Sequence, residues 1–577
     1  MFQSIRECVL GTLKQYSVDI RTDLITVEPP KDQSFGDIYT NAAMLFAKKA
    51  GVSPRELAEA ICKNLLECQF VSDAVIAGPG FINIRLRDSA WQNVVNNVLM
   101  KKEKYSDADI GAGALMNVEF VSANPTGPLH TGHARNAVFG SVVANLFEKI
   151  GYKVAREFYV NDQGNQIKAL ARSVYLRYQE LLGRKIQDDA FGADMYCGGY
   201  VKDIAQKLID AYEAELLDKD ESEWMDLLRK FSIDQMLDNI KDDLESIGIS
   251  MEQYTSEEAL CKKKLVDEAL DILIRHGDIY EGVLPRPKGI GDDDEWEERP
   301  QTLFRATKYG DDVDRAIKKS DGTWTYFAGD LAYHLDKIRR GYSRMVAVLG
   351  ADHNGYLKRL KAAVRALSND SADIEIRLYQ LVNFLENSIP IKMSKRSGNF
   401  ITLKDVVERV GKDVTRYMMI SRHHDVMIDF DFAKAIAHSM DNPLFYIQYA
   451  YARICSVFKH YESIFGEINN QALIDCDKSC LFDVAEISLM KALAFWPEQV
   501  KTTAIAIEPH RIPNYLQNIA YLFHALWNKG KANTVLRFID KDDKNCTISK
   551  LSLLQATRFV IEDGLKIMGI VPMSEMI

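Results

Sequence analysis

An apolar strand, a turn rich in proline and glycine, an amphipathic helix and a second apolar strand follow one another between residues 116 and 160. The strands are expected over 116–122 and 154–160, and the helix over 135–150. Gly151 is placed to end the helix. This order and spacing predict a βαβ unit, in which two parallel strands are joined by a right-handed crossover. The chain is therefore expected to fold around a parallel sheet.

The same pattern returns later in the chain. Strands are expected over 345–349 and 374–381, with a helix between them over about 355–367. A helix-rich segment, about 167–282, separates the two patterns and is interpreted as an insertion. Together these features predict one α/β domain over 106–440, built on a doubly wound parallel sheet.

Smaller domains are expected on both sides of this α/β domain. Residues 1–105 combine helical patterns such as 53–66 with an alternating strand over 80–87, which is typical of a small α+β domain. A charged, polar stretch, 101–109, is interpreted as a linker. Over 441–577 long helical patterns without a strand pattern predict an all-α C-terminal domain.

The composition excludes several classes of protein. No run of about 18 apolar residues is present, so a membrane protein is not expected, and the first residues lack a secretory signal. The nine cysteines are scattered without zinc-type spacing, which favours a reducing, cytoplasmic compartment and predicts no structural metal. The net charge of −10 argues against indiscriminate coating of nucleic acid, but local basic patches could still hold a specific RNA.

The helix after the Pro/Gly-rich turn is expected to begin near the sequence HTGH, residues 130–133. Helix N-termini present unpaired N–H groups and a partial positive charge, which makes this turn suitable for phosphate. His130 and His133 share one helix face, and Gly132 leaves space for a base or a phosphate. Such imidazole donors can stabilise charge that grows on an α-phosphate when pyrophosphate is displaced. The alternative is a helix start that happens to contain two histidines.

A second motif, Lys392-Met393-Ser394-Lys395, is followed by Arg396 in a loop with serine and glycine. A mobile loop with cations is suited to close on a triphosphate and to hold the leaving pyrophosphate. Taken alone, such a loop is more often a solvated surface segment. The two motifs resemble the HIGH and KMSKS motifs of class I aminoacyl-tRNA synthetases, although Arg396 interrupts the second.

The class I resemblance implies a Rossmann-like catalytic domain that uses ATP, bound with Mg²⁺ as a substrate complex. It assigns catalysis to His130, His133 and Lys395. The ATP site that the resemblance implies consists of His130, Gly132, His133, His353, Lys392, Met393, Ser394 and Lys395. The first motif also occurs in some nucleotidylyltransferases, which are an alternative for that motif alone.

Glu119 is an acidic residue within an apolar strand, where both faces of a parallel sheet are usually covered. A buried carboxylate is costly unless it is paired with a cation or protonated. A guanidinium is the best bidentate match. Alternatively, Glu119 points to the polar end of the sheet or pairs with an internal arginine.

Segments along nearly the whole chain resemble arginyl-tRNA synthetases. They include 118–133, FYVNDQGNQI, TYFAGDLAYH, GADHNGY and NPLFYIQYAYARI. The resemblance implies ATP-dependent activation of L-arginine and its transfer to the terminal adenosine of the arginine-specific tRNA, with the first step requiring tRNA. It places the arginine guanidinium between Glu119 and Asp330, its α-carboxylate and amine at Ser122 and Asn124, and Tyr326 beside its side chain. His133 also belongs to this implied arginine site.

The same resemblance assigns the flanking domains to tRNA. Residues 1–105 are similar to an N-terminal domain that touches the tRNA elbow, with Phe81 and Asn83 at the matching loop. The C-terminal domain is similar to the family's helical anticodon-binding domain. Exposed aromatic and arginine side chains that stack on unpaired bases are the usual means of reading single-stranded RNA loops. The matching residues in this domain are Tyr446, Tyr449, Arg453 and Met576. The tyrosines could instead be core residues.

Three alternatives make distinguishable predictions. Another class I synthetase, such as one for cysteine, would need a zinc site of cysteine and histidine, which the sequence lacks. A nucleotidylyltransferase would be far shorter, and a non-catalytic RNA-binding relative would have lost His130, His133 or Lys395. A monomer is expected from the family, and the acidic segment 292–298 is expected to be an exposed loop.

Overall fold

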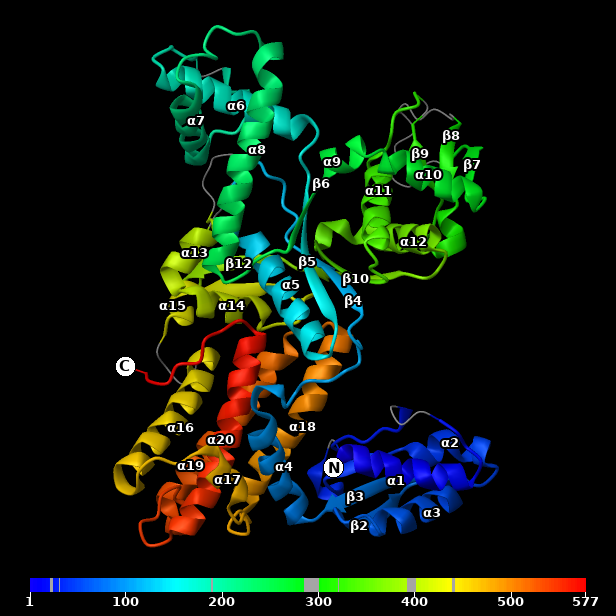
Figure 1. Cartoon of the computed structure of the whole chain (residues 1–577), viewed down its shortest axis with the longest axis vertical. Coiled ribbons are helices and arrows are strands. Elements are labelled where there is room, and N and C mark those ends of the chain that lie inside the picture. The colour runs from blue at the N-terminus through cyan, green and yellow to red at the C-terminus, as the bar shows by residue number, and fades with distance from the viewer. Residues whose placement is uncertain are drawn as a thin grey trace.

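A five-stranded parallel sheet lies at the centre of the computed structural model (Figure 1). The structure describes residues 1–20, 24–30, 32–187, 190–192, 194–284, 300–319, 321–391, 401–437 and 442–576. The strand order is β11-β10-β4-β5-β6, so the predicted doubly wound parallel sheet is confirmed. The strands are β4 (Leu115–Glu119), β5 (Lys153–Val160), β6 (Gln253–Ser256), β10 (Arg344–Gly350) and β11 (Asp373–Tyr379).

The order of the strands reverses between β4 and β10. Helix α5 (Thr131–Lys149) connects β4 to β5, and α12 (Leu357–Ser368) connects β10 to β11 on the other side of the reversal. In open α/β sheets, ligands bind outside the carboxyl ends of the strands at such a switch point. The strand expected over 116–122 ends earlier, at Glu119, because Val121 and Ser122 have φ angles of +68° and +39°.

Two lobes rise above the carboxyl ends of the sheet (Figure 1). One is helical and has its own apolar core around the stacked rings of Tyr175 and Trp224. Its helices are α6 (Asn165–Leu181), α7 (Gly199–Tyr212) and α8 (Glu221–Ser246). The other lobe combines an antiparallel sheet with helices around a second core. It contains α9 (Glu257–Lys262), α10 (Leu265–Arg275), β7 (Ile279–Gly282), β8 (Gln301–Phe304), β9 (Arg315–Lys318) and α11 (Tyr326–Arg339).

The segment 167–282, expected as an insertion, also supplies part of the central sheet. Strand β6 lies within this segment and pairs with β5 through Glu157–Val160 and Gln253–Ser256. The insertion is therefore not purely helical, and the helical lobe returns the chain to the sheet edge.

A small three-stranded sheet with covering helices forms the N-terminal unit, in the order β1-β3-β2. Its elements are α1 (Phe2–Gln15), β1 (Ile38–Thr40), α2 (Ala42–Ala50), α3 (Pro54–Leu66), β2 (Val71–Ala77) and β3 (Phe81–Leu86). Ser53 caps α3 by accepting a hydrogen bond from the Glu56 N–H, with Pro54 at the first helical position. The next helix, α4 (Asp88–Lys101), packs against C-terminal helices α18 and α20 rather than this sheet.

The described residues of the C-terminal domain, 442–576, contain helices and no strand, as predicted. The helices are α16 (Pro443–Phe465), α17 (Asn470–Asp475), α18 (Val484–Ala506), α19 (Arg511–Ala532) and α20 (Lys544–Ile567). Between the central sheet and this domain lie β12 (Val382–Glu386), β13 (Ile389–Pro390), α13 (Leu403–Val410), α14 (Lys412–Ile420), β14 (Ile428–Asp431) and α15 (Phe432–Ala435). Among the helices of the described ranges, none has the length and apolar character needed to cross a bilayer.

Candidate active site

The first turn of α5 carries the two histidines at the switch point. His130 is the N-cap, and its Nδ1 accepts a hydrogen bond from the Gly132 N–H at 3.1 Å. The His133 Nδ1 accepts from the His130 N–H at 3.3 Å, and the two rings stack with centroids 3.7 Å apart. A Cβ on Gly132 would lie 2.9 Å from His130 Cε1, so a larger residue here would have to displace the His130 ring. The paired rings at a helix N-terminus form a surface suited to phosphate.

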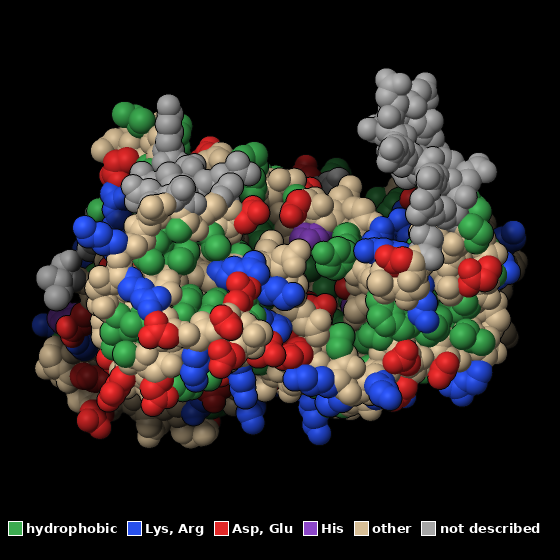
Figure 2. All heavy atoms as spheres, turned by 90° about the horizontal axis from the view of Figure 1, so that it is seen from above, with side chains coloured by type: hydrophobic (Ala, Val, Ile, Leu, Met, Phe, Trp, Pro, Cys, Tyr) green, Lys and Arg blue, Asp and Glu red, His purple; other side chains and the backbone are tan. Residues whose placement is uncertain are grey.

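The molecule is hollowed between the two upper lobes. Figure 2 looks down on them and shows histidine surface in the hollow. Helix α8 reaches this region through Asp243, which accepts a hydrogen bond from the Leu129 N–H at 3.1 Å. Burial raises the pKa of Asp243 to about 6. The helical lobe is therefore attached directly to the residue that precedes the HTGH turn.

The segment after the basic loop returns to the start of α5. The Leu403 N–H donates to the Leu129 carbonyl at 2.8 Å, and the Thr131 N–H donates to the Ile401 carbonyl at 3.4 Å. Thr402 caps α13 by accepting from the Asp405 N–H. Tertiary folding thus brings residues 401–403, which follow the KMSK motif in the chain, next to the HTGH turn. Four predicted ATP-site residues lie outside the described residues: Lys392, Met393, Ser394 and Lys395.

Three carboxylates gather beside the carboxyl ends of β4 and β5. Burial, and next the charges of Glu257, Asp330 and Glu119, raise the pKa of the Tyr159 hydroxyl. Burial and the Glu119 charge also raise the pKa of Asp330 to about 7. An added Cβ at Gly329, next to Asp330, would lie 3.5 Å from Glu257 Oε1. Glu119, Glu257 and Asp330 therefore make an acidic cluster that favours a cationic ligand.

Glu119 already has one internal cation. Its carboxylate accepts a hydrogen bond from Lys337 Nζ at 2.6 Å, and Glu119 and Lys337 are 8% and 0% exposed. Glu119 Oε1 accepts a second hydrogen bond from Ser122 Oγ at 3.2 Å. Glu119 therefore does pair with an internal cation, as the alternative interpretation expected. The cation is Lys337, however, and not an arginine. This ion pair joins the end of β4 to α11, the helix that carries both Lys337 and Asp330.

Ser122 and Asn124 follow Glu119 and face β5 and α6. Ser122 Oγ accepts a hydrogen bond from the Tyr159 N–H at 3.1 Å, and Asn124 Nδ2 donates to Gln166 Oε1 at 3.0 Å. Ser122 therefore contacts the acidic cluster directly through Glu119, and both residues lie in the chain between Glu119 and the start of α5.

His353 and Tyr326 are both exposed. His353 follows β10 in a short helical segment, and its ring lies 3.7 Å from the Asp352 carboxylate. Tyr326 begins α11 and is 91% exposed, so its ring is not packed against the acidic cluster. Tyr159 lies beside the cluster, where burial and next the Glu257 charge raise the pKa of its hydroxyl, and its ring centroid lies 4.5 Å from that of Tyr333.

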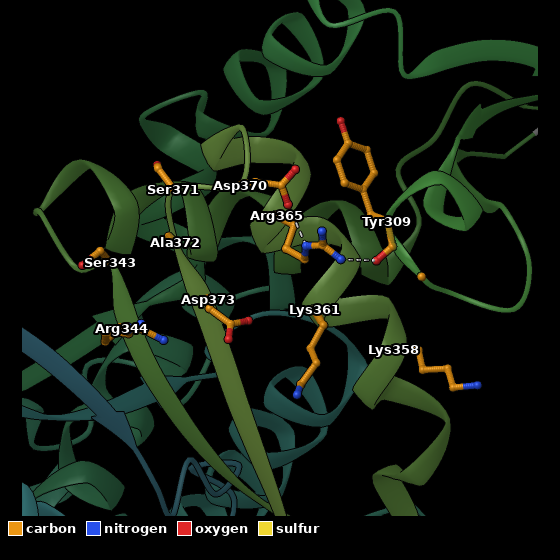
Figure 3. A pocket seen from close by; sticks show the side chains of 11 residues that line it. Tyr309, Ser343, Arg344, Lys358, Lys361, Arg365, Asp370, Ser371, Ala372 and Asp373 are labelled. Carbon is orange, nitrogen blue, oxygen red and sulfur yellow. Dashed lines mark hydrogen bonds and ion pairs between the residues drawn. The ribbon is translucent and has the colours of Figure 1, made fainter. Parts of the chain in front are cut away.

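A cavity of about 680 Å³ lies at the other end of the sheet (Figure 3). It is lined by the amino ends of β10 and β11 and by α12, and it presents several cations. These cations are largely neutralised, since Arg365 pairs with Asp370 at 2.7 Å and Lys361 with Glu375 at 3.2 Å. Its distance from the switch point and its balanced charge exclude it as the candidate active site.

Three family models match successive parts of the chain. They are described as "Arginyl tRNA synthetase N terminal domain" over 3–86, "tRNA synthetases class I (R), catalytic domain" over 94–442, and "DALR anticodon binding domain" over 447–576. The catalytic model alone matches more than half of the chain. The chain belongs to the arginyl-tRNA synthetase family. The family predicted from the resemblance of segments along the chain is therefore confirmed.

Curated relatives of this arginyl-tRNA synthetase family agree over the full length. Arginine–tRNA ligase of Parvibaculum lavamentivorans is 49% identical over 579 residues, covering 100% of this chain and 99% of its own. The ligase of Wolbachia pipientis wMel is 48% identical, covering 98% and 97%. The solved arginyl-tRNA synthetase of Thermus thermophilus has a TM-score of 0.72 over 100% of both chains, and at 19% identity it supports the fold alone.

The predicted tRNA-facing residues fall on the two flanking domains of this family member. Phe81 and Asn83 lie within strand β3, in agreement with the strand expected over 80–87, rather than in the loop that the resemblance implied. On α16, Arg453 Nη2 donates to the Tyr449 hydroxyl at 2.7 Å, and its guanidinium lies 4.1 Å from the Tyr449 ring centroid. Tyr446 packs near His524 on α19, with ring centroids 4.6 Å apart.

The C-terminal tail, which ends near Met576, returns to the same part of α16. Gln448 Nε2 donates to the Val571 carbonyl at 2.8 Å, and the Met573 N–H donates to Gln448 Oε1 at 2.8 Å. The tail therefore docks on α16, the helix that carries the half-buried Tyr446, Tyr449 and Arg453.

Sequence reasoning missed three residues of the candidate site: Tyr159, Glu257 and Lys337. Lys337 stands in the charged stretch 336–340, so no local signal marks it as a buried partner. Glu257 stands in a polar strand-to-helix junction, where acidic residues are common, so no local signal separates it from a helix cap. Tyr159 lies in the strand expected over 154–160, where an aromatic residue is common, so the pattern did not single it out.

Proposed function

We infer that this family member is an arginine–tRNA ligase, in which ATP activates L-arginine and the arginyl group then passes to the terminal adenosine of tRNA. The observation that supports this inference is that two kinds of binding group lie at the same switch point of the sheet. A histidine pair at a helix N-terminus and a cluster of three carboxylates flank the same switch point. The first suits a triphosphate and the second suits a guanidinium, which matches the two small substrates of the reaction.

In the first step the arginine carboxylate attacks the α-phosphorus of ATP, and the bond to the leaving pyrophosphate breaks. We assign the guanidinium to Glu119 and Asp330, and the carboxylate and amine end to Ser122 and Asn124, with His133 adjoining. Glu257 joins the guanidinium site because it lies beside Gly329 on α11. The step depends on positioning and electrostatic stabilisation, so we expect no covalent enzyme intermediate.

ATP is assigned to His130, Gly132 and His133, to His353, and to the loop residues Lys392, Met393, Ser394 and Lys395. The contact of residues 401–403 with Leu129 and Thr131 supports this, because residue 401 is only six positions after Lys395 in the chain. Mg²⁺ is proposed to arrive with the ATP phosphates, its usual ligands. Within the described ranges no group of three or more His, Cys, Asp or Glu side chains is arranged to hold a metal.

We assign the tRNA to both flanking domains: the elbow to Phe81 and Asn83 in residues 1–105, and the anticodon to Tyr446, Tyr449, Arg453 and Met576 in 441–577. The match to an anticodon-binding model over 447–576 supports the second assignment. The 106–440 domain holds the catalytic groups. We further propose that the protein is a monomer and acts in the cytoplasm, where tRNA is charged.

A charging assay with ATP, each amino acid and total tRNA tests the proposal. Arginine should be attached to tRNA, and arginine-dependent pyrophosphate exchange should appear only when tRNA is present. Attachment of another amino acid in place of arginine, or adenylylation of a small cofactor precursor, would contradict it.

Arginine binding is expected to weaken as the pH falls below about 7. Burial and then the Glu119 charge raise the pKa of Asp330 to about 7, and a guanidinium pairs with the ionised carboxylate. Below this pKa arginine must displace a proton, so its KM should rise by up to about tenfold per pH unit, and above it KM should level off. Steady-state kinetics at several pH values, with ATP saturating, measure this change. Asp330→Asn should remove the slope; an equal rise in the KM for ATP would contradict the assignment.

A further inference from the structure

The chain leaves β4 through a strained turn rather than a straight extension. The Ser122 N–H donates to the Phe120 carbonyl at 3.0 Å across Val121, whose φ is +68°. A three-residue turn with positive φ is the rarer and more strained form of the γ-turn. A β-branched residue such as valine is an outlier there, and Ser122 follows with a φ of +39°. Such strain persists only where the surroundings hold it in place.

Asn136 holds this turn from helix α5. Its side chain is 3% exposed; Oδ1 accepts a hydrogen bond from the Val121 N–H at 2.7 Å, and Nδ2 donates to the Val348 carbonyl at 2.9 Å. Val348 belongs to β10, across the switch point from β4. One amide therefore ties the turn to α5 and to β10, the two elements that flank the crevice.

A second contact with α5 fixes the other side of the turn. The Phe120 ring packs on Gly140, where an added Cβ would lie 2.2 Å from the ring. Between these two contacts the chain direction changes, and Ser122 Oγ reaches both Glu119 Oε1 and the Tyr159 N–H. Relaxation of Val121 to negative φ would rotate the peptide that follows it and would move Ser122 away from these partners.

We propose that Asn136 is a positioning residue, which sets the turn that carries Ser122 and Asn124 against the histidine-bearing first turn of α5. Through this link the arginine carboxylate is held at the α-phosphate of ATP. The proposal rests on the assignment of Ser122 and Asn124 to arginine made above. Its physical basis is that productive attack requires the reacting atoms to lie within a narrow range of distance and angle. Asn136 itself touches neither substrate.

The test compares Asn136→Ala with the double variant Asn136→Ala/Val121→Gly. The single variant should raise the KM for arginine by about tenfold or more and slow adenylate formation, with the KM for ATP within about twofold of the wild-type value. Glycine adopts positive φ without strain, so the added Val121→Gly change should recover part of the loss. A purely structural role for Asn136 would not produce this selective effect or its recovery.

Asn145→Ala is the matched control on the same helix. Asn145 Nδ2 donates to the Ile567 carbonyl at 2.9 Å, and its Oδ1 accepts from Arg156 at 2.7 Å, at the far end of α5. Its loss should lower the melting temperature and leave both KM values unchanged. Should Asn136→Ala fail to fold, Asn136→Asp keeps an acceptor for the Val121 N–H but loses the donor to Val348, and should raise the arginine KM selectively.

Three results would overturn the proposal: an arginine KM within about twofold of wild type in the folded Asn136 variant, an equal rise in the KM for ATP, or no recovery in the double variant. The wild-type protein is assayed first for arginine charging. Failure of wild type to charge arginine would reject the proposed function itself. Normal wild-type charging with an unaffected Asn136 variant would reject only the positioning role.

Discussion

Glu119→Gln is expected to raise the KM for arginine by about 10²-fold to several thousandfold, with little change in the KM for ATP. Removing one partner of a buried, hydrogen-bonded charge pair commonly costs about 3–5 kcal/mol. Glu119 is buried at the end of β4 in the acidic cluster, so a bound guanidinium there would lose a charged acceptor. Steady-state charging and calorimetric titration of arginine measure the effect.

The Glu119 variant needs a control for stability, because it also leaves the buried Lys337 without its carboxylate. Glu157→Gln is the matched variant: Glu157 lies opposite Glu119 in the strand register, is fully buried and pairs with Arg340 at 2.7 Å. Both variants should lower the melting temperature, and only Glu119→Gln should weaken arginine binding selectively. Equal arginine affinity in the two variants would show that Glu119 serves the fold alone.

Lys395→Ala is expected to slow adenylate formation by about 10²–10³-fold while arginine binding changes little. The cation is assigned to charge that develops on the leaving pyrophosphate, and loss of one such contact typically costs about 2.7–4 kcal/mol of barrier. A single-turnover measurement with tRNA present separates this step from product release. His133→Ala should act in the same direction, since its ring lies in the first turn of α5.

Lys404→Ala is the control for the loop variant. Lys404 lies just after the loop on α13, is exposed and pairs only weakly with Glu408 at 4.0 Å. It should retain the wild-type rate, because an exposed ion pair of this kind contributes little. An unchanged single-turnover rate for Lys395→Ala, or an equal loss for Lys404→Ala, would remove the catalytic assignment of the loop.

Most of the fold could be predicted because its strands and helices have clear local patterns. The strand expected over 154–160 is β5, Lys153–Val160, and the helix expected over 135–150 is α5, Thr131–Lys149. Strand β6 could not be predicted: it is four residues long, polar, and held in the sheet by backbone pairing with β5. The end of β4 at Glu119 could not be predicted from the sequence either, because the positive φ angles at Val121 and Ser122 depend on contacts from α5.

The candidate site was predictable only in part. An acid within an apolar strand singled out Glu119, and the spacing of His130 and His133 indicated their shared helix face. Neither signal could name Lys337, which is 218 residues from Glu119 in the chain and meets it only in the folded protein. The exposure of Tyr326 and the position of Tyr159 beside the acidic cluster were equally invisible to local pattern.

The sequence by itself determined the architecture and the family. Periodicity specifies which segments form strands and helices, and short motifs specify the residues of a phosphate-binding helix start. Tertiary structure alone decided which charges meet at the switch point, and that Asn136 binds the turn after β4 to β10. The physical reason is that secondary structure depends on neighbours within a few residues, whereas ion pairs and hydrogen bonds across elements depend on distances set by the packing of the whole domain.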